Sequence, residues 1–192
     1  MEREIERHRK PLCSGGQGAE SCSFRSARVN TGKQVSIEAL RGTDIFAGLS
    51  GHDLEQIAKV CVERTYQAGE RCAVQGEETD ELRIVNGGKV AIQLRIEAAP
   101  YTQALTTTTL TRGNVLAWSA LVEPHVQTAS ARCIGMAQVL CIKASDLQRI
   151  FKERPSIERV VMKNLATVIS SRLRDSSTQL VRLVCEMIKQ RG

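Results

Sequence analysis

Short strand-like segments separated by turns occupy residues 60–142, and this pattern constrains the fold more than any other feature of the chain. In residues 90–96 an apolar side chain stands at every second position, which is the period of a strand with one buried face. The Asn-Gly-Gly turn at residues 86–88 comes just before, and such residues tolerate the positive φ of a hairpin. Pro100 is expected to end the strand, and the β-branched residues 106–111 predict the next one. Short strands at regular spacing predict an antiparallel roll or barrel.

Helical patterns flank the strands. Two short helices are expected ahead of them, and Ser50 is expected to cap the second, with Asp53 in the capping-box position. After the last strand, Ser145 is expected to cap another helix, and Pro155 to begin a long one that runs toward residue 190. The sequence therefore predicts an α+β protein: an antiparallel β-roll, jelly-roll-like in type, with short N-terminal helices and a long C-terminal helix.

This pattern divides the chain into three parts. Residues 1–35 are rich in Gly, Ser, Arg and Glu and are expected to be a mobile arm. Residues 36–155 hold the roll with its flanking helices, and residues 156–192 the long helix. A helix of roughly 50 Å, at 1.5 Å per residue, is too long for one small roll to cover. Its second half is expected to pair with another copy to form a homodimer; packing within one chain is the alternative.

Composition excludes some classes of protein. No apolar run approaches the roughly 20 residues that span a bilayer, and the charged N-terminus is not a signal peptide. We therefore expect a cytoplasmic protein without a membrane segment. The net charge is +6, and residues 152–192 hold nine Lys or Arg against four Asp or Glu. Nucleic acid, an acidic partner or a membrane surface could meet such a helix, but a solvated face is favoured.

Seven cysteines in a chain with no export signal are expected to stay reduced. Cys13 and Cys22 lie in the arm, too few and too far apart to predict a metal or cluster site. Four others stand among apolar residues and are interpreted as small hydrophobes: Cys61, Cys133, Cys141 and Cys185.

Eight short motifs follow one another in a particular order and spacing between Leu40 and Leu173. They are Phe46-Ala47-Gly48-Leu49-Ser50, Tyr66-Gln67-Ala68-Gly69-Glu70, Gln75-Gly76-Glu77, Asp80-Glu81-Leu82, Gly88-Lys89-Val90, Gly113-Asn114-Val115, Gln138-Val139-Leu140-Cys141-Ile142 and Ser171-Arg172-Leu173. Each is weak alone, but together they resemble the cyclic-nucleotide-binding domain family, the sensor module of catabolite-activator-type regulators.

The stretch that begins at Gly113 lies where this family carries its phosphate-binding cassette. The cassette usually reads Phe-Gly-Glu and then Arg-Thr/Ser-Ala, where the Glu binds the ribose hydroxyl and the Arg neutralises the cyclic phosphate. By this resemblance Trp118 stands at the ribose position and Gln127 at the phosphate position. The candidate ligand-binding residues are Gly113, Asn114, Leu116, Ala117, Trp118, Ser119, Ala120, Gln127, Thr128, Ala129 and Arg83.

These two replacements weaken the expected affinity. Tryptophan cannot accept a hydrogen bond from a hydroxyl, and glutamine cannot form a bidentate charged pair. Each lost charge-assisted hydrogen bond is worth about 1.5–3 kcal/mol, so losing two weakens binding by on the order of 10²–10⁴-fold. No cofactor is expected other than a cyclic nucleotide or another small ligand. Arg83 could restore a positive charge, or could be an exposed strand residue.

Trp118 is the one tryptophan of an aromatic-poor chain. It could plug the former pocket, form a wall for a different planar or apolar ligand, or lie on the surface or in a partner interface. His125 alone does not make a metal site.

Two functions follow as hypotheses. The first is a regulatory module that senses a small ligand in the roll and signals to an unknown protein partner through the long helix. The alternative is a scaffold or dimerisation protein with a non-functional pocket. An enzyme is not expected, because no nucleophile–base set or phosphate-binding loop is found. Direct DNA binding is not expected either, because the few residues after Met187 are fewer than the roughly 60 of a DNA-binding domain.

Overall fold

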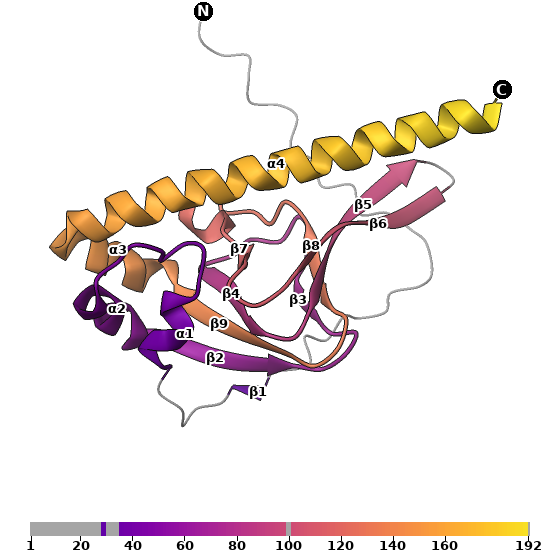
Figure 1. Ribbon diagram of the computed structural model, residues 1–192. Coiled ribbons are helices and arrows are strands. Elements are labelled where there is room, and N and C mark those ends of the chain that lie inside the picture. Colours follow the sequence, from indigo (N-terminus) through magenta and orange to yellow (C-terminus); the bar gives the residue numbers. More distant parts are fainter. Residues whose placement is uncertain (1–27, 30–34, 99–100, 192) are drawn as a thin grey trace, which may run out of the picture.

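The computed structural model describes residues 28–29, 35–98 and 101–191 (Figure 1). The expected mobile arm, with Cys13 and Cys22, lies almost wholly outside the described residues. The elements are β1 (Arg28–Val29), α1 (Ile37–Arg41), α2 (Gly51–Ala58), β2 (Cys61–Tyr66), β3 (Arg71–Ala73), β4 (Glu81–Gly87), β5 (Val90–Ala98), β6 (Tyr101–Leu110), β7 (Val115–Ala117), the 3-10 helix η1 (Ser119–Leu121), β8 (Ser130–Cys133), β9 (Ala137–Lys143), α3 (Ala144–Glu153) and α4 (Pro155–Arg191).

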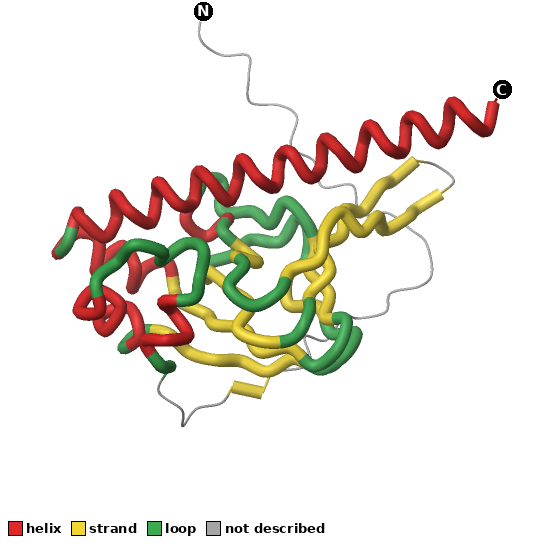
Figure 2. Tube along the Cα trace, viewed as in Figure 1, coloured by secondary structure: helices red, strands yellow, loops and turns green. Residues whose placement is uncertain are grey.

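The strands form two antiparallel sheets that close into a roll. One sheet has the order β1-β2-β9-β4-β7 and the other β3-β8-β5-β6. In Figure 2 the strands gather on one side of the molecule, and the short helices lie at one end of them. The predicted α+β roll with short N-terminal helices and one long C-terminal helix is confirmed.

Two apolar clusters hold the fold together, one on each face of the first sheet. Along β4 the side chains alternate, because successive residues of a strand point to opposite faces. Leu82 and Ile84 pack with the helices, beside Phe46 and Ile157. Val85 packs inside the roll. The roll therefore has an apolar interior of its own, separate from the core beneath the helices.

The structure confirms one of the two predicted serine caps. Ser50 caps α2 as expected: its Oγ accepts a hydrogen bond from the Asp53 amide at 3.2 Å. The expectation for Ser145 is wrong, because α3 begins one residue earlier, at Ala144, and no side chain caps it. The Ala144 amide instead donates to the carbonyl of Asp80 at 2.7 Å, so the neighbouring loop supplies the acceptor.

The hairpin of β5 and β6 is longer than predicted. Strand β6 begins at Tyr101 rather than at residue 106, and it pairs with β5 from Ala98↔Tyr101 to Val90↔Leu110. Backbone pairing with β5 thus carries the strand through Gln103, Ala104 and Leu105, which have no strong preference for β structure of their own.

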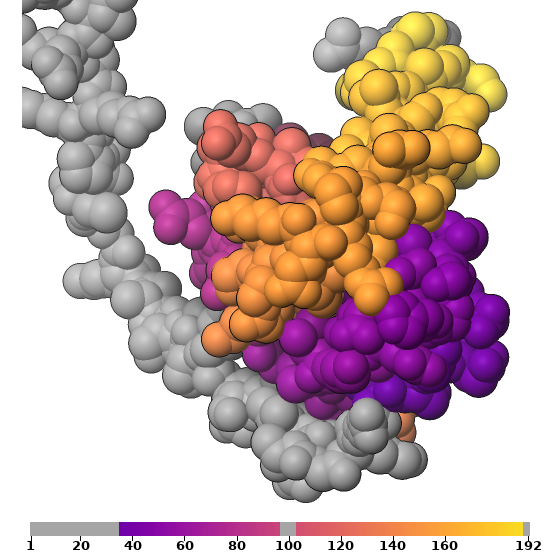
Figure 3. Space-filling view, turned by 90° about the vertical axis from the view of Figure 1, so that its left-hand side faces the viewer, coloured from indigo at the N-terminus to yellow at the C-terminus, as the bar shows by residue number. Residues whose placement is uncertain are grey.

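Helix α4 has two different surroundings along its 37 residues. Its first half lies on the roll and the N-terminal helices (Figure 3), and Asn164 Nδ2 donates to the carbonyls of Ile45 and Ala47 at 3.1 and 2.9 Å. Its second half extends beyond them. Cys185, expected to be a small buried hydrophobe, is exposed there because α4 has left the roll at that point. Large apolar side chains are exposed on the same half: Leu173, Leu180, Val181, Val184, Met187 and Ile188.

No helix in the described part of the chain is both long enough and apolar enough to span a membrane.

Candidate functional site

A glycine fixes the start of the cassette. Gly113 has a φ of +90°, and a Cβ there would collide with the carbonyl oxygen of Gly42. Next to it, Asn114 Nδ2 donates to Asp44 Oδ2 at 2.9 Å. The amide of Asp44 donates to the Gly113 carbonyl at 3.0 Å. These contacts join the cassette to the α1–α2 connection, so Gly113 and Asn114 position the loop and lie outside the hollow that the cassette surrounds.

That hollow lies between the cassette, β5 and α4. Its volume is about 30 Å³, room for one or two water molecules. Ile92 and Arg172 line it together with seven predicted residues: Leu116, Ala117, Trp118, Ser119, Gln127, Thr128 and Ala129. The fold therefore brings most of the predicted residues together.

Gln127 is the most unusual residue of this lining. Its side chain is 6% exposed. Its backbone is fixed on both sides, because its amide donates to the Glu77 carbonyl and its carbonyl accepts from the Gly76 amide, both at 2.8 Å. Among the described residues, its Nε2 is the one buried side-chain nitrogen or oxygen without a hydrogen-bond partner. Buried polar groups are nearly always hydrogen-bonded, so this unused donor is a feature that requires an explanation.

Arg172 reaches the hollow from α4. Its Nη2 donates to the carbonyl of Val115 at 3.3 Å. Burial lowers the pKa of Arg172, and the charges of Asp175 and Asp44 oppose this only in part. No carboxylate of the described residues forms a salt bridge with it. The side of the hollow formed by α4 therefore carries a positive charge that is poorly neutralised.

Trp118 follows β7 and has a partly buried side chain. It packs against the core beneath the helices and also lines the hollow. This position agrees with its interpretations as a plug or as a ligand-facing wall, and disfavours a location on the outer surface.

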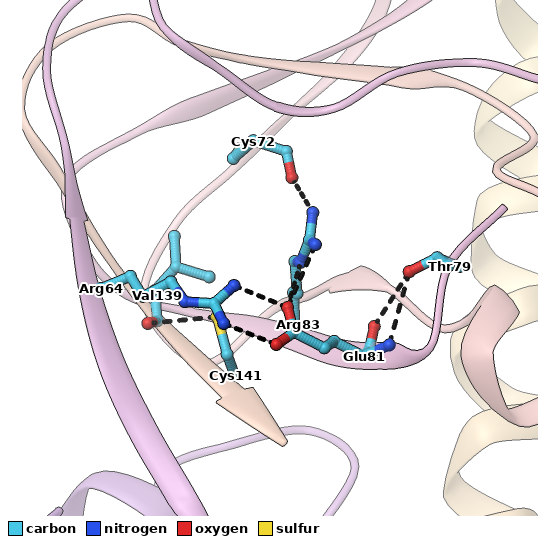
Figure 4. Close-up of polar contacts among 7 residues, drawn as sticks. All are labelled: Arg64, Cys72, Thr79, Glu81, Arg83, Val139 and Cys141. Atoms are coloured by element: carbon cyan, nitrogen blue, oxygen red, sulfur yellow. Dashed lines mark hydrogen bonds and ion pairs between the residues drawn. The ribbon is translucent and has the colours of Figure 1, made fainter. Parts of the chain in front are cut away.

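Arg83 does not line the hollow. The expectation that it is an exposed strand residue is wrong, because its side chain is largely buried. Its side chain is 12% exposed and faces the roll interior, where Nη2 lies 3.1 Å from Glu81 Oε2 (Figure 4). Its Nη1 donates to the Cys72 carbonyl. Arg64 binds the same carboxylate through both oxygens at 2.6 Å. Because Arg83 is paired with Glu81 and does not line the hollow, this arginine is poorly placed to supply a charge there.

The charge of Glu81 is maintained by these two arginines. Burial would raise the pKa of Glu81, but hydrogen bonds and charges, first from Arg64 and then from Arg83, outweigh burial and leave that pKa below its usual value. The cluster is thus an internal ion network that joins β2 to β4.

A wider surface cleft lies between the β3–β4 connection and α3, with a volume of about 420 Å³. Ala120, predicted as a ligand residue, lines this cleft rather than the hollow, together with His125 and the acidic Glu78 and Asp80. No group of three or more metal-ligating side chains occurs among the described residues.

Sequence reasoning missed two features. Arg172 belongs to the Ser171-Arg172-Leu173 motif, and the signal for its role is a cation on the helix face toward the roll. The thiols of Cys72 and Cys133 lie 3.9 Å apart, buried on the paired strands β3 and β8. The buried positions of Cys61, Cys133 and Cys141 agree with their interpretation as small hydrophobes.

Comparison with known proteins identifies the same fold. A putative cyclic nucleotide-binding protein from Geobacter metallireducens GS-15 matches with a TM-score of 0.61 and 24% identity, over 72% of this chain and 98% of that one. The catabolite activator protein of Thermus thermophilus matches with a TM-score of 0.59 and 23% identity, over 74% of this chain and 63% of that one. At these identities the likeness shows the fold alone.

A curated relative, Glutaminase 1 of Bradyrhizobium diazoefficiens, is 28% identical over 131 residues. The match covers 67% of this chain but only 20% of that protein. The family described as "Cyclic nucleotide-binding domain" matches residues 63–154, which include β4 to β9 and the whole cassette. Residues 63–154 are therefore similar to the cyclic nucleotide-binding domain family, and the shared fold agrees with that similarity.

Proposed function

We propose that this protein is a regulatory module that senses a small ligand in the hollow and transmits binding through α4. The observation that carries the proposal is the position of Arg172, which lies on α4 and lines the same hollow as the cassette residues Trp118 and Gln127. A ligand there contacts both elements. Because a ligand shifts a conformational equilibrium only through its different affinity for the two states, such shared contacts are what signalling requires.

Ordinary cyclic AMP affinity is not part of this proposal. No carboxylate side chain lines the hollow to accept a ribose hydroxyl. A neutral glutamine stands where the family has its phosphate arginine. The volume of about 30 Å³ is also far below the roughly 300–1,000 Å³ of usual ligand pockets. A ligand must therefore displace Trp118 or α4 as it enters.

We also propose that the module regulates rather than catalyses. The matched segment is a fifth of the glutaminase relative, so the activity in that relative's name does not transfer to this chain. Partner proteins would receive the signal through the exposed second half of α4.

Titration of the protein with cyclic AMP, cyclic GMP and small organic acids tests the proposal, with Trp118 fluorescence and thermal unfolding as readouts. A sensor should give a saturable fluorescence change together with a raised Tm. No response to any ligand at millimolar concentration would leave the scaffold alternative.

Replacement of Trp118 by Ala separates the two functions. A plug in a dead pocket behaves as a core aromatic, and emptying such a site costs about 3–5 kcal/mol of unfolding free energy. A ligand-facing wall should cost clearly less, because such a ring makes much of its contact with the ligand rather than with the core, and the ligand-induced rise in Tm should disappear. Chemical denaturation of both proteins measures the difference.

A further inference from the structure

We propose that the ligand is a small organic anion, with one carboxylate or phosphate head and an apolar body, and that Gln127 and Arg172 bind the head together. This inference rests on the proposed function and specifies the ligand class of that same site. It places the recognition of charge on α4 rather than on the cassette.

The first argument is the unused donor. Gln127 Nε2 is buried, lies in the lining of the hollow and has no acceptor among the described residues. Leaving an amide donor dry and unpaired is unfavourable, and a ligand oxygen would remove that cost. An anionic oxygen is the strongest acceptor available, because hydrogen bonds to ionised groups are shorter and stronger than neutral ones.

The second argument is the charge of Arg172. Its guanidinium is partly desolvated, and within the described part of the chain its hydrogen bond goes to the neutral carbonyl of Val115. A guanidinium presents a planar set of donors that fits a carboxylate or a phosphate. An anion in the hollow would neutralise this charge at short range and would link α4 to the loop that carries Gln127.

The third argument is what the hollow lacks. Its other polar side chains, Ser119 and Thr128, are neutral hydroxyls, and no acidic side chain lines it. A ligand rich in hydroxyl donors therefore finds no charged acceptor. The remaining walls are apolar, from Ile92, Trp118 and neighbouring small residues. They favour a hydrocarbon or aromatic body, for which the Trp118 ring can move aside.

The test compares probes that share a body and differ in the head: phenylacetate, phenyl phosphate and the neutral phenylacetamide, with cyclic AMP alongside. Trp118 fluorescence gives the Kd of each. At least one anion is expected to bind at least 10-fold more tightly than the amide. The acid and the phosphate arms distinguish the two kinds of head. Equal affinity for the amide and both anions would overturn the anionic assignment while leaving a ligand-sensing module in place.

Matched variants assign the residues. Arg172→Met and Arg174→Met each remove one positive charge from α4, but Arg174 is exposed and does not line the hollow. Anion affinity should fall at least 10-fold in Arg172→Met and in Gln127→Leu, and should be unchanged in Arg174→Met. Equal losses in the two arginine variants would mean a long-range charge effect, and the proposed contact would be wrong.

If cyclic AMP saturates the protein at micromolar concentration and the acids do not, the ligand class is wrong but the proposed function stands. If no probe binds at all, the proposed function fails as well.

Discussion

At the scale of single residues, the site is built around groups that the free protein leaves unsatisfied. Gln127 has a buried donor without an acceptor, and Arg172 has a partly buried charge without a salt bridge to any described residue. By contrast, the buried carboxylate of Glu81 forms salt bridges with both Arg64 and Arg83. Unsatisfied groups reduce stability, and they are concentrated here around one hollow. This contrast supports the proposed binding site.

Replacement of Gln127 by Leu should stabilise the free protein by about 1–3 kcal/mol, the cost of an unpaired buried polar group. Urea denaturation measures the change in unfolding free energy. Gln138→Leu is a suitable control, because Gln138 is exposed and surface substitutions usually stay within about 0.5 kcal/mol. If Gln127→Leu instead lowered the unfolding free energy by about 1–3 kcal/mol, the Gln127 amide would have a hydrogen-bond partner.

The ion network predicts a dependence of stability on pH. Because the pKa of Glu81 is lowered in the folded protein, its contribution is present above the pKa of the unfolded state and is lost as the pH falls through the folded value. Glu81→Gln should therefore flatten the acid side of the stability profile. It should also cost about 3 kcal/mol at neutral pH, because Arg64 and Arg83 lose their counter-charge. Denaturation midpoints from pH 3 to 7 measure both effects; an unchanged profile would contradict this account.

At the scale of elements, α4 has one role on the roll and another beyond it. In its second half, apolar side chains follow one another at spacings of seven, four and three: Leu173, Leu180, Val184 and Met187. Such spacing places them on one helix face. Their exposure is unusual for side chains of this size. In the predicted homodimer, α4 of a second copy would cover this apolar face. The homodimer stays a prediction.

Replacement of Leu180 by Asp should therefore shift the protein from dimer to monomer. Thr178→Asp introduces the same charge about 160° around the helix, at the 100° per residue of an α-helix, and should leave the dimer intact. Light scattering during size-exclusion chromatography gives both masses. A wild-type monomer at high micromolar concentration would contradict the dimer, and equal dissociation in both variants would contradict pairing through this face.

At the scale of the whole molecule, the hollow and α4 form one connected unit. Arg172 links α4 to β7 through the Val115 carbonyl, across 57 residues of sequence. Asn164 links it to the α1–α2 connection. A ligand that engages Arg172 therefore acts on the helix that carries the exposed apolar face.

Hydrogen–deuterium exchange can detect this coupling. A ligand that saturates the Trp118 signal should slow amide exchange in the cassette and also in α4 around residues 165–180, because both elements hold it. In Arg172→Met, residual protection should be confined to the cassette. Protection limited to the cassette in the wild-type protein would contradict transmission through α4.

Much of the fold was predictable because its signals are local. Period-two apolar residues indicated β5, Ser50 marked the start of α2, and Pro155 that of α4. Seven of the eleven predicted ligand residues do surround one hollow, because the cassette is a continuous stretch whose neighbours in sequence are also neighbours in space. The end of the β5–β6 hairpin was not predictable, because pairing rather than intrinsic preference set it.

The sequence by itself determined the order and type of most elements, since each depends on residues within a few positions of one another. The resemblance to the family supported the expected roll and added the loss of the usual cassette charges. Only the tertiary structure decided which charges meet. It paired Arg83 with Glu81 inside the roll and brought Arg172 to the hollow from α4. It also left the Gln127 amide without a partner. These outcomes depend on distances between elements far apart in the chain, and burial there determines whether a polar group is satisfied or left available for a ligand.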